Sequence, residues 1–231
     1  KGLLLSDELG EPEDAVACFA NVVQDDPGND GALMALEHLC EDPASRASAS
    51  AVLVPIYKAR EDWEPLTQLL RAQLDDIEDT EIRVAALREI ATLERDLLND
   101  GEGAFEALSQ AYMLGPDTAG LEPELEALGV QLERHAVLAD LYGDALQVSP
   151  GRAVELHFKI AQLAEYQLGD LQRSIDAHTE ILEVDVDNEN AFQALEALYE
   201  KSEQPEAMAD LLLRKAGLED DPIRAKSILM R

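Results

Sequence analysis

The chain has 231 residues, of which 46% are hydrophobic, so it can bury a core in one elongated domain or two compact ones. Its 49 acidic residues outnumber its 18 basic ones, and the formal net charge of −31 repels nucleic-acid phosphates and anionic lipid. This composition argues against a disordered acidic tail and against binding to DNA, RNA or a membrane surface.

Helices are expected along the whole chain, because Ala and Leu dominate and no segment alternates with period two. In chain order they are expected near residues 1–9, 12–25, 29–41, 45–59, 62–76, 80–98, 102–114, 121–131, 134–147, 151–168, 171–184, 188–201, 204–217 and 221–231. No apolar run is long enough to span a membrane and no secretory signal is present, which favours the cytoplasm. The chain opens with KGLLLSDELG, so we expect it to be a piece of a longer protein.

Residues at the ends of these segments are of the types that begin helices. N-caps are expected at Asn29, Asp170 and Asn188. Prolines fall in first turns, where a missing N–H costs little, at Pro12, Pro65 and Pro205. Trp63 begins a helix with an apolar stripe, so we expect it to fill a gap between hairpins rather than to anchor a partner.

One segment, PASRASASAVLVPIYKARED at 43–62, has no counterpart later in the chain. We expect an inserted helix there, kinked or interrupted before Pro55. An odd helix disturbs the stacking of a paired array. Three parts are therefore expected: N-terminal hairpins at 1–42, the inserted helix with a bend at 43–62, and a further array at 63–231 that stops inside a helix.

Two pairs of segments show that the chain repeats itself. LGEPEDAVACFANVVQDDPGNDGALMALEHLCED, from Leu9, aligns without a gap with LGDLQRSIDAHTEILEVDVDNENAFQALEALYEK, from Leu168. REIATLERDLLND, from Arg88, aligns with FKIAQLAEYQLGD, from Phe158. The repeating unit therefore holds four helices, and two hairpins of about 35 residues each match the size of known helical repeats.

Certain repeat positions follow a wider pattern. An aromatic, a leucine and an aromatic stand on one helix at Phe192, Leu195 and Tyr199. Small and large residues followed by an exit proline form two sets, on the expected helices at 12–25 and 102–114: Ala15, Phe19, Val22 and Pro27, and Ala104, Leu108, Ala111 and Pro116. The turn glycines are Gly10 and Gly169. These residues resemble the tetratricopeptide repeat (TPR) family in a degenerate form, with Glu196, His178 and Val186 in place of its Gly, aromatic residue and Pro. The half-a-TPR and Sel1-like families are alternatives.

The TPR resemblance implies an all-α fold, a right-handed α-solenoid superhelix of antiparallel helix hairpins, and work as a non-catalytic protein–protein adaptor. The positions that match the family's concave groove are Glu89, Asp96, Lys159, Tyr166, Asn190, Gln193, Glu200 and Lys201. Some members hold a peptide's terminal carboxylate with a clamp of Lys and Asn. The Asn place beside Lys159 is Leu163 here, so binding of acidic C-terminal tails is not expected.

No catalytic, metal or cofactor site is expected from the reactive residue types. The histidines lie on different expected helices, without metal-ligand spacing, at His38, His135, His157 and His178. Cys18 and Cys40 are too few for a disulfide framework, and we interpret both as small buried hydrophobic residues. Acidic pairs are too numerous for their spacing to identify a catalytic pair.

The stretch DVDNENAFQALE at 185–196 spaces its acidic residues in the manner of a calcium loop. Its repeat copy, DPGNDGALMALE, has the required glycine at Gly31 but lacks an acid at the third place. Neither copy is complete, and Glu196 would have to reach back about two helical turns past Phe192. We therefore interpret the stretch as the hinge between two hairpins.

The expected partner is a protein or peptide, and the acidic excess leaves two interpretations open. It is either a docking surface for a basic partner or a solvated coat that keeps a long protein soluble. The alternative function is a structural module that assembles with copies of itself. Ile223 and Met230 would lack a following helix to cover them, so we expect self-association through uncapped ends or a longer array.

Overall fold

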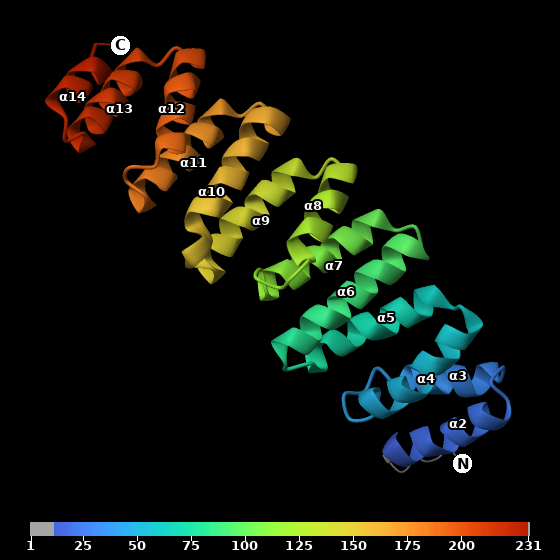
Figure 1. Cartoon of the computed structure of the whole chain (residues 1–231). Coiled ribbons are helices and arrows are strands. Elements are labelled where there is room, and N and C mark those ends of the chain that lie inside the picture. The colour runs from blue at the N-terminus through green and yellow to red at the C-terminus, as the bar shows by residue number, and fades with distance from the viewer. Residues whose placement is uncertain (1–11, 231) are drawn as a thin grey trace. The chain divides into compact units, whose positions relative to one another are not determined.

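The computed structural model describes residues 12–230, and over that range it contains helices and turns but no strand (Figure 1). The α-helices are α2 (Pro12–Asp25), α3 (Asp30–Leu39), α4 (Arg46–Arg60), α5 (Trp63–Gln73), α6 (Thr80–Asp96), α7 (Gly101–Leu114), α8 (Leu121–Gln131), α9 (His135–Val148), α10 (Ala153–Leu163), α11 (Leu171–Val184), α12 (Glu189–Lys201), α13 (Pro205–Leu218) and α14 (Pro222–Ile228). The expected all-α fold is confirmed. The helix expected at 1–9 lies outside the described residues.

Two expected helices are extended by tighter or wider turns. The segment expected at 62–76 is α5 followed by a 3₁₀ turn, η1 (Leu74–Asp76). The segment expected at 151–168 begins with the 3₁₀ turn η2 (Pro150–Arg152) and ends with the π-helical turn η3 (Ala164–Leu168). Gly169 follows η3 with a φ of 66°, a backbone conformation that residues with a side chain rarely adopt. Its expected role as a turn glycine is confirmed.

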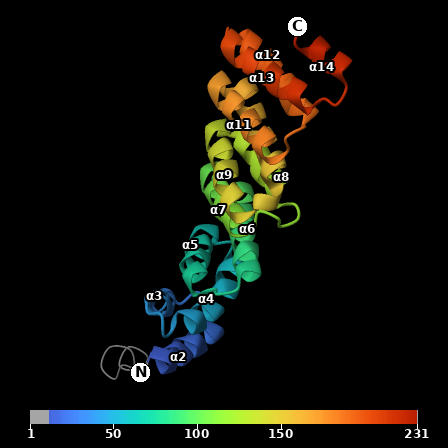
Figure 2. The ribbon, with the colours of Figure 1, turned by 90° about the vertical axis from the view of Figure 1, so that its left-hand side faces the viewer.

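The contacts of the chain divide it into two compact units, one ending at Gly115 and one beginning at Pro116. Within each unit, helices that follow one another in sequence pack against one another, as in α6 with α7 and α10 with α11 (Figures 1 and 2). This packing confirms an array of helix hairpins. The right-handed superhelix and the bend at 43–62 stay predictions.

The core of the first unit includes α4, the helix expected to be an insertion. Leu53 and Tyr57 of α4 are buried in one cluster with Leu36 of α3 and Leu66 of α5, and Trp63 packs partly buried against it. The expected interruption before Pro55 is wrong, because α4 runs unbroken from Arg46 to Arg60. A proline removes a single backbone donor, which a helix packed on α2, α3 and α5 can tolerate. A kink there stays a prediction.

The core of the second unit joins residues of α11, α12 and α13. Ile181 of α11, Phe192 and Leu195 of α12 and Leu211 of α13 lie in one buried cluster. The three expected N-caps are confirmed, since side chains of Asn29, Asp170 and Asn188 accept from the backbone N–H groups of Ala32, Arg173 and Ala191, each at 3.0 Å. Local sequence signals therefore begin these helices at the predicted places.

Candidate functional site: a repeated glutamate and the pockets beside it

A Leu-Glu pair recurs at the same place in three hairpins. It stands at Leu36-Glu37 on α3, at Leu125-Glu126 on α8 and at Leu195-Glu196 on α12. The leucine of each pair is fully buried, at 0%, 0% and 1% exposed, so it fixes the face of the helix. The neighbouring glutamate is consequently turned toward the helix that follows, where each one meets a different set of partners.

Glu126 is held by a tyrosine and a lysine from the next two helices. The Tyr142 hydroxyl on α9 donates to it at 2.6 Å, and the Lys159 ammonium on α10 forms ion pairs with both Glu126 and Glu122, the latter at 2.6 Å. Lys159 also lies over the Tyr142 ring, 5.3 Å from its centroid. Burial would lower the pKa of Lys159, but its two carboxylate partners outweigh that effect and raise it.

Glu196 is neutralised in a similar way by Lys215 of α13. The Lys215 ammonium lies 3.0 Å from Glu196 and 2.9 Å from Glu189, and 5.4 Å from the centroid of the Phe192 ring. The carboxylate that closes the calcium-like stretch is therefore part of an ion pair between helices. Asp185 in the same stretch accepts from the Asn188 amide at 2.7 Å. Within residues 12–230, no group of three or more His, Cys, Asp or Glu side chains is arranged to hold a metal ion.

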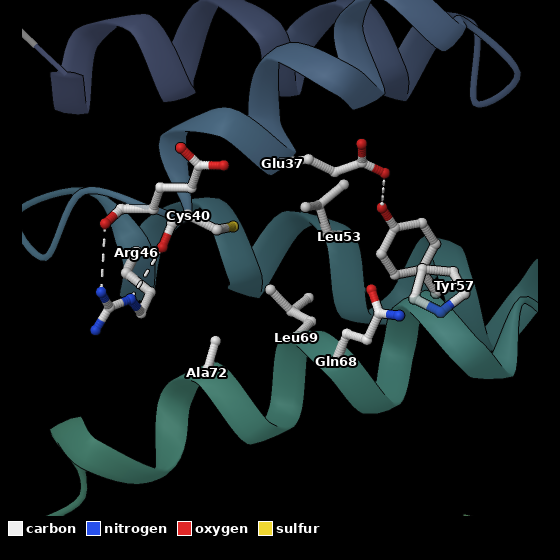
Figure 3. Close-up of a pocket in the computed structure, with 10 residues that line it drawn as sticks. Glu37, Cys40, Arg46, Leu53, Tyr57, Gln68, Leu69 and Ala72 are labelled. Carbon is white, nitrogen blue, oxygen red and sulfur yellow. Dashed lines mark hydrogen bonds between the residues drawn. The ribbon is translucent and has the colours of Figure 1, made fainter.

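Glu37 has the tyrosine but not the lysine. The Tyr57 hydroxyl on α4 donates to its carboxylate, as Tyr142 does to Glu126. No ion pair of Glu37 occurs in the part of the chain that the structure describes, and the α5 residue near it is Gln68 (Figure 3). Tyr57 lies in the segment without a sequence counterpart, so the alignment gave no sign that it would take the place of Tyr142.

Three of the expected groove residues line two adjoining pockets in the second unit. Lys159 and Tyr166 line a cavity of about 360 Å³ beside Tyr142. Tyr166 and Asn190 line a second cavity, of about 330 Å³, whose wall includes Phe158. Tyr166 is 70% exposed and contributes to both cavities. The structure therefore brings Lys159, Tyr166 and Asn190 into one neighbourhood.

The other expected groove residues of the second unit lie on the surface of α12. Gln193 is exposed and donates to Glu189 at 3.1 Å. Lys201 forms an ion pair with Glu165 at 3.2 Å, and Glu200 beside it is exposed. Glu165 belongs to η3 of the preceding hairpin and lines the second cavity, so Lys201 contacts the neighbouring hairpin through this ion pair.

The two expected groove residues of the first unit each pair with a basic side chain. Glu89 is exposed on α6 and accepts from Lys58 of α4 at 2.9 Å. Asp96 ends α6 and pairs with its neighbour Arg95 at 2.7 Å, which lowers the pKa of Asp96. The structure does not place these two residues at any of the cavities described above.

His178, expected to stand in place of an aromatic residue and not to bind a metal, is packed in the core of the second unit. His178 is 7% exposed on α11 and packs edge-on against the Phe158 ring, with centroids 5.6 Å apart. Its Nδ1 atom is buried with no hydrogen-bond partner, and burial lowers its pKa. The burial of His178 could have been predicted from its place at a repeat position that is normally aromatic. The cysteines fit their interpretation in part, since Cys40 is buried while Cys18 is only half-buried.

No protein-family model and no curated protein matches the sequence. Among solved structures, similar chains include MamA from Desulfovibrio magneticus RS-1, with 13% identity, a TM-score of 0.37, and coverage of 76% of this chain and 97% of that one. The P58(IPK) TPR domain has 14% identity and a TM-score of 0.36, with coverage of 94% and 64%. PilF of Pseudomonas aeruginosa has 15% identity and a TM-score of 0.33, with coverage of 96% and 98%.

None of the described helices combines the length and the apolar character needed to cross a membrane. The hairpin architecture itself rests on the packing of this chain's own helices.

Proposed function

We propose that the chain is a non-catalytic scaffold that binds a protein or peptide partner between its hairpins. The observation that carries this proposal is Tyr166, a large aromatic side chain left 70% exposed at the junction of two cavities. Tyrosine is enriched at binding hot spots, because it offers a large apolar ring together with one polar group. A partner that covers Tyr166 would fill the cavities on both sides.

The lining of these cavities suits binding to a peptide backbone. Gln162 belongs to both cavities and Asn190 to the second, and each side-chain amide can donate and accept hydrogen bonds. Ala161, Ala194 and Ala197 form small surfaces of the second cavity, which leaves space for a chain to approach. These groups supply recognition, and the ammonium of Lys159 is already occupied by Glu122 and Glu126.

Capture of partners from the native cell with the whole chain tests this function. Tyr166→Ala is expected to weaken retention of the captured partner about tenfold or more, as loss of an aromatic hot spot does. Tyr166→Phe keeps the ring and is expected to retain the partner. Val148→Ala, at another exposed apolar residue of the same unit, is the matched control. Retention that Tyr166→Ala leaves unchanged would contradict the proposal.

A second candidate function, assembly with copies of itself, is favoured by the apolar surface of the last two helices. Leu213 of α13, Ile223 of α14 and Met230 after it are 59%, 79% and 77% exposed. A second copy that covered these side chains would gain the burial that they lack here. Light scattering over a range of concentrations tests this, and association that Ile223→Asp abolishes is the expected result. A monomer at every concentration would reject it.

A further inference from the structure

The three repeated glutamates differ in whether a lysine of the chain pairs with them. Lys159 and Lys215 each place an ammonium against the glutamate and over an aromatic ring, at Glu126 and Glu196. At Glu37 the aromatic residue is present as Tyr57, but within residues 12–230 no lysine or arginine pairs with the carboxylate. Two of the three glutamates therefore have an ammonium partner within the chain, although the ring beside it is Tyr142 of the following helix at Glu126 and Phe192 of the same helix at Glu196.

A pocket of about 360 Å³ lies at this third position, between α3, α4 and α5 (Figure 3). Leu53 and Leu69 form its apolar floor, and Glu37 and Tyr57 stand together on one side. This lining would accept the aliphatic stem of a long side chain and present a carboxylate and an aromatic ring to its charged end.

The cation that already lines this pocket is used elsewhere. Arg46 lies on the opposite side from Tyr57 in Figure 3, and it donates to the Cys40 carbonyl at 2.9 Å. It also forms an ion pair at 2.9 Å with Asp76, which lies outside the residues drawn. It therefore holds the C-terminal end of α3 and leaves Glu37 without a counter-ion. Burial and the hydrogen bond to Glu37 raise the pKa of Tyr57, so its hydroxyl keeps its proton and donates to the Glu37 carboxylate.

We propose that the pocket between α3, α4 and α5 receives a lysine or arginine side chain from a partner protein, which takes the position at Glu37 that Lys159 takes at Glu126. This inference deepens the proposed scaffold function and rests on it, because it names the chemistry of one partner contact. The charge of the whole chain favours the same partner, since a net charge of −31 attracts basic segments from a distance.

A short blocked peptide, Ala-Ala-Leu-Lys-Leu-Ala-Ala, is the probe, and the same peptide with norleucine in place of lysine is its neutral control. Titration into the whole chain, followed by NMR, is expected to shift the methyl signals of Leu53 and Leu69 with the lysine peptide. The norleucine peptide is expected to bind about tenfold more weakly, because it cannot form the charged hydrogen bond to Glu37.

Two variants locate the effect. Glu37→Gln keeps an acceptor for Tyr57 but removes the charge, and it is expected to erase the preference for lysine over norleucine. Gln68→Lys supplies an internal ammonium on α5, and it is expected to weaken the lysine peptide about tenfold by competing for Glu37. Glu13→Gln, at an exposed residue of α2, removes the same charge away from the pocket and is the matched control.

Equal binding of the two peptides, or equal losses in Glu37→Gln and Glu13→Gln, would overturn this inference, because the attraction would then be a general effect of the acidic surface. That result would leave the scaffold function standing if partner capture still depends on Tyr166. Conversely, a lysine preference that depends on Glu37 supports this pocket even if Tyr166→Ala has no effect on capture.

Discussion

At the scale of single residues, the first unit contains a buried carboxylate that is paired with an arginine. Glu94 of α6 is 5% exposed, and Arg71 of α5 donates to both of its oxygens at 2.9 Å. Arg71 also donates to the Gly103 carbonyl on α7 at 3.3 Å, so one guanidinium connects three helices. Burial raises the pKa of Glu94, and Arg71 limits the rise.

Removal of Arg71 is expected to leave a buried charge without its partner. Arg71→Met should lower the free energy of unfolding by about 3–5 kcal/mol near pH 7, and Arg71→Met combined with Glu94→Leu should recover most of that loss. Denaturant unfolding followed by circular dichroism measures both. A double variant no more stable than Arg71→Met would contradict this account.

The pH dependence of that variant has a definite sign. Without Arg71 the pKa of Glu94 in the folded state rises further above its ordinary value of 4.5, so the folded state binds a proton that the unfolded state releases. The destabilisation caused by Arg71→Met is therefore expected to shrink as the pH falls from neutrality toward 4.5.

His178 gives the second unit a pH dependence of its own. Burial holds its pKa below the ordinary 6.5, and Glu165 opposes this weakly. The unfolded chain therefore takes up a proton before the folded one, and stability is lost as the pH falls below about 6.5. His178→Leu should reduce the change in the thermal unfolding midpoint between pH 7 and pH 5, as measured by thermal scans. His157, whose pKa burial also lowers, should leave a smaller residual slope.

At the scale of the element, several helices begin with a side-chain cap, and ion pairs connect neighbouring hairpins. Asn29 and Asn188 cap equivalent helices with the same geometry. Pairs such as Arg173 with Asp140 at 2.8 Å and Arg214 with Glu183 at 2.7 Å then join helices that are not consecutive. Exposed pairs contribute little individually, so the caps and the buried leucines decide where helices lie.

The caps are testable because the repeat offers a matched pair. Asn188→Ala is expected to lower the free energy of unfolding by about 1 kcal/mol, whereas Asn188→Asp should be close to neutral, because aspartate also accepts from the first-turn N–H groups. Asn29→Ala should have a similar effect in the first unit. Hydrogen exchange at Ala191 and Ala32 measures each local effect. Unchanged protection in both alanine variants would contradict it.

At the scale of the whole molecule, the basic side chains interact with other groups of the same chain. Among residues 12–230, every lysine and arginine except Lys226 takes part in a polar or ionic interaction. With 49 acidic residues against 18 basic ones, the remaining surface charge is carboxylate. Mutual repulsion among these carboxylates opposes folding at low ionic strength.

Salt is consequently expected to stabilise the chain. The screening length falls from about 10 Å at 0.1 M to about 3 Å at 1 M, which removes long-range repulsion more than it weakens pairs in contact. The thermal midpoint should therefore rise with added sodium chloride. Tetramethylammonium chloride is the control for effects specific to sodium. A midpoint that falls with salt would show that the ion pairs outweigh the repulsion.

The sequence by itself determined the helices, because their signals are local. Caps such as Asn188, first-turn prolines such as Pro205, and apolar residues at helical spacing lie within a few residues of the structure they specify. The repeat alignment added the hairpin architecture, since equivalent leucines such as Leu36 and Leu195 must be buried in equivalent ways.

Only the tertiary structure decided which side chains meet. Tyr57 has no aligned counterpart, yet it donates to Glu37 as Tyr142 donates to Glu126. Lys215 pairs with Glu196 from α13, whereas α9, the helix that follows Glu126 in the preceding repeat, contains no lysine. Such contacts join residues far apart in sequence, and they depend on how each helix is rotated and spaced against the next. Helical periodicity specifies which face is buried, but not which charged side chain on a neighbouring helix comes within reach.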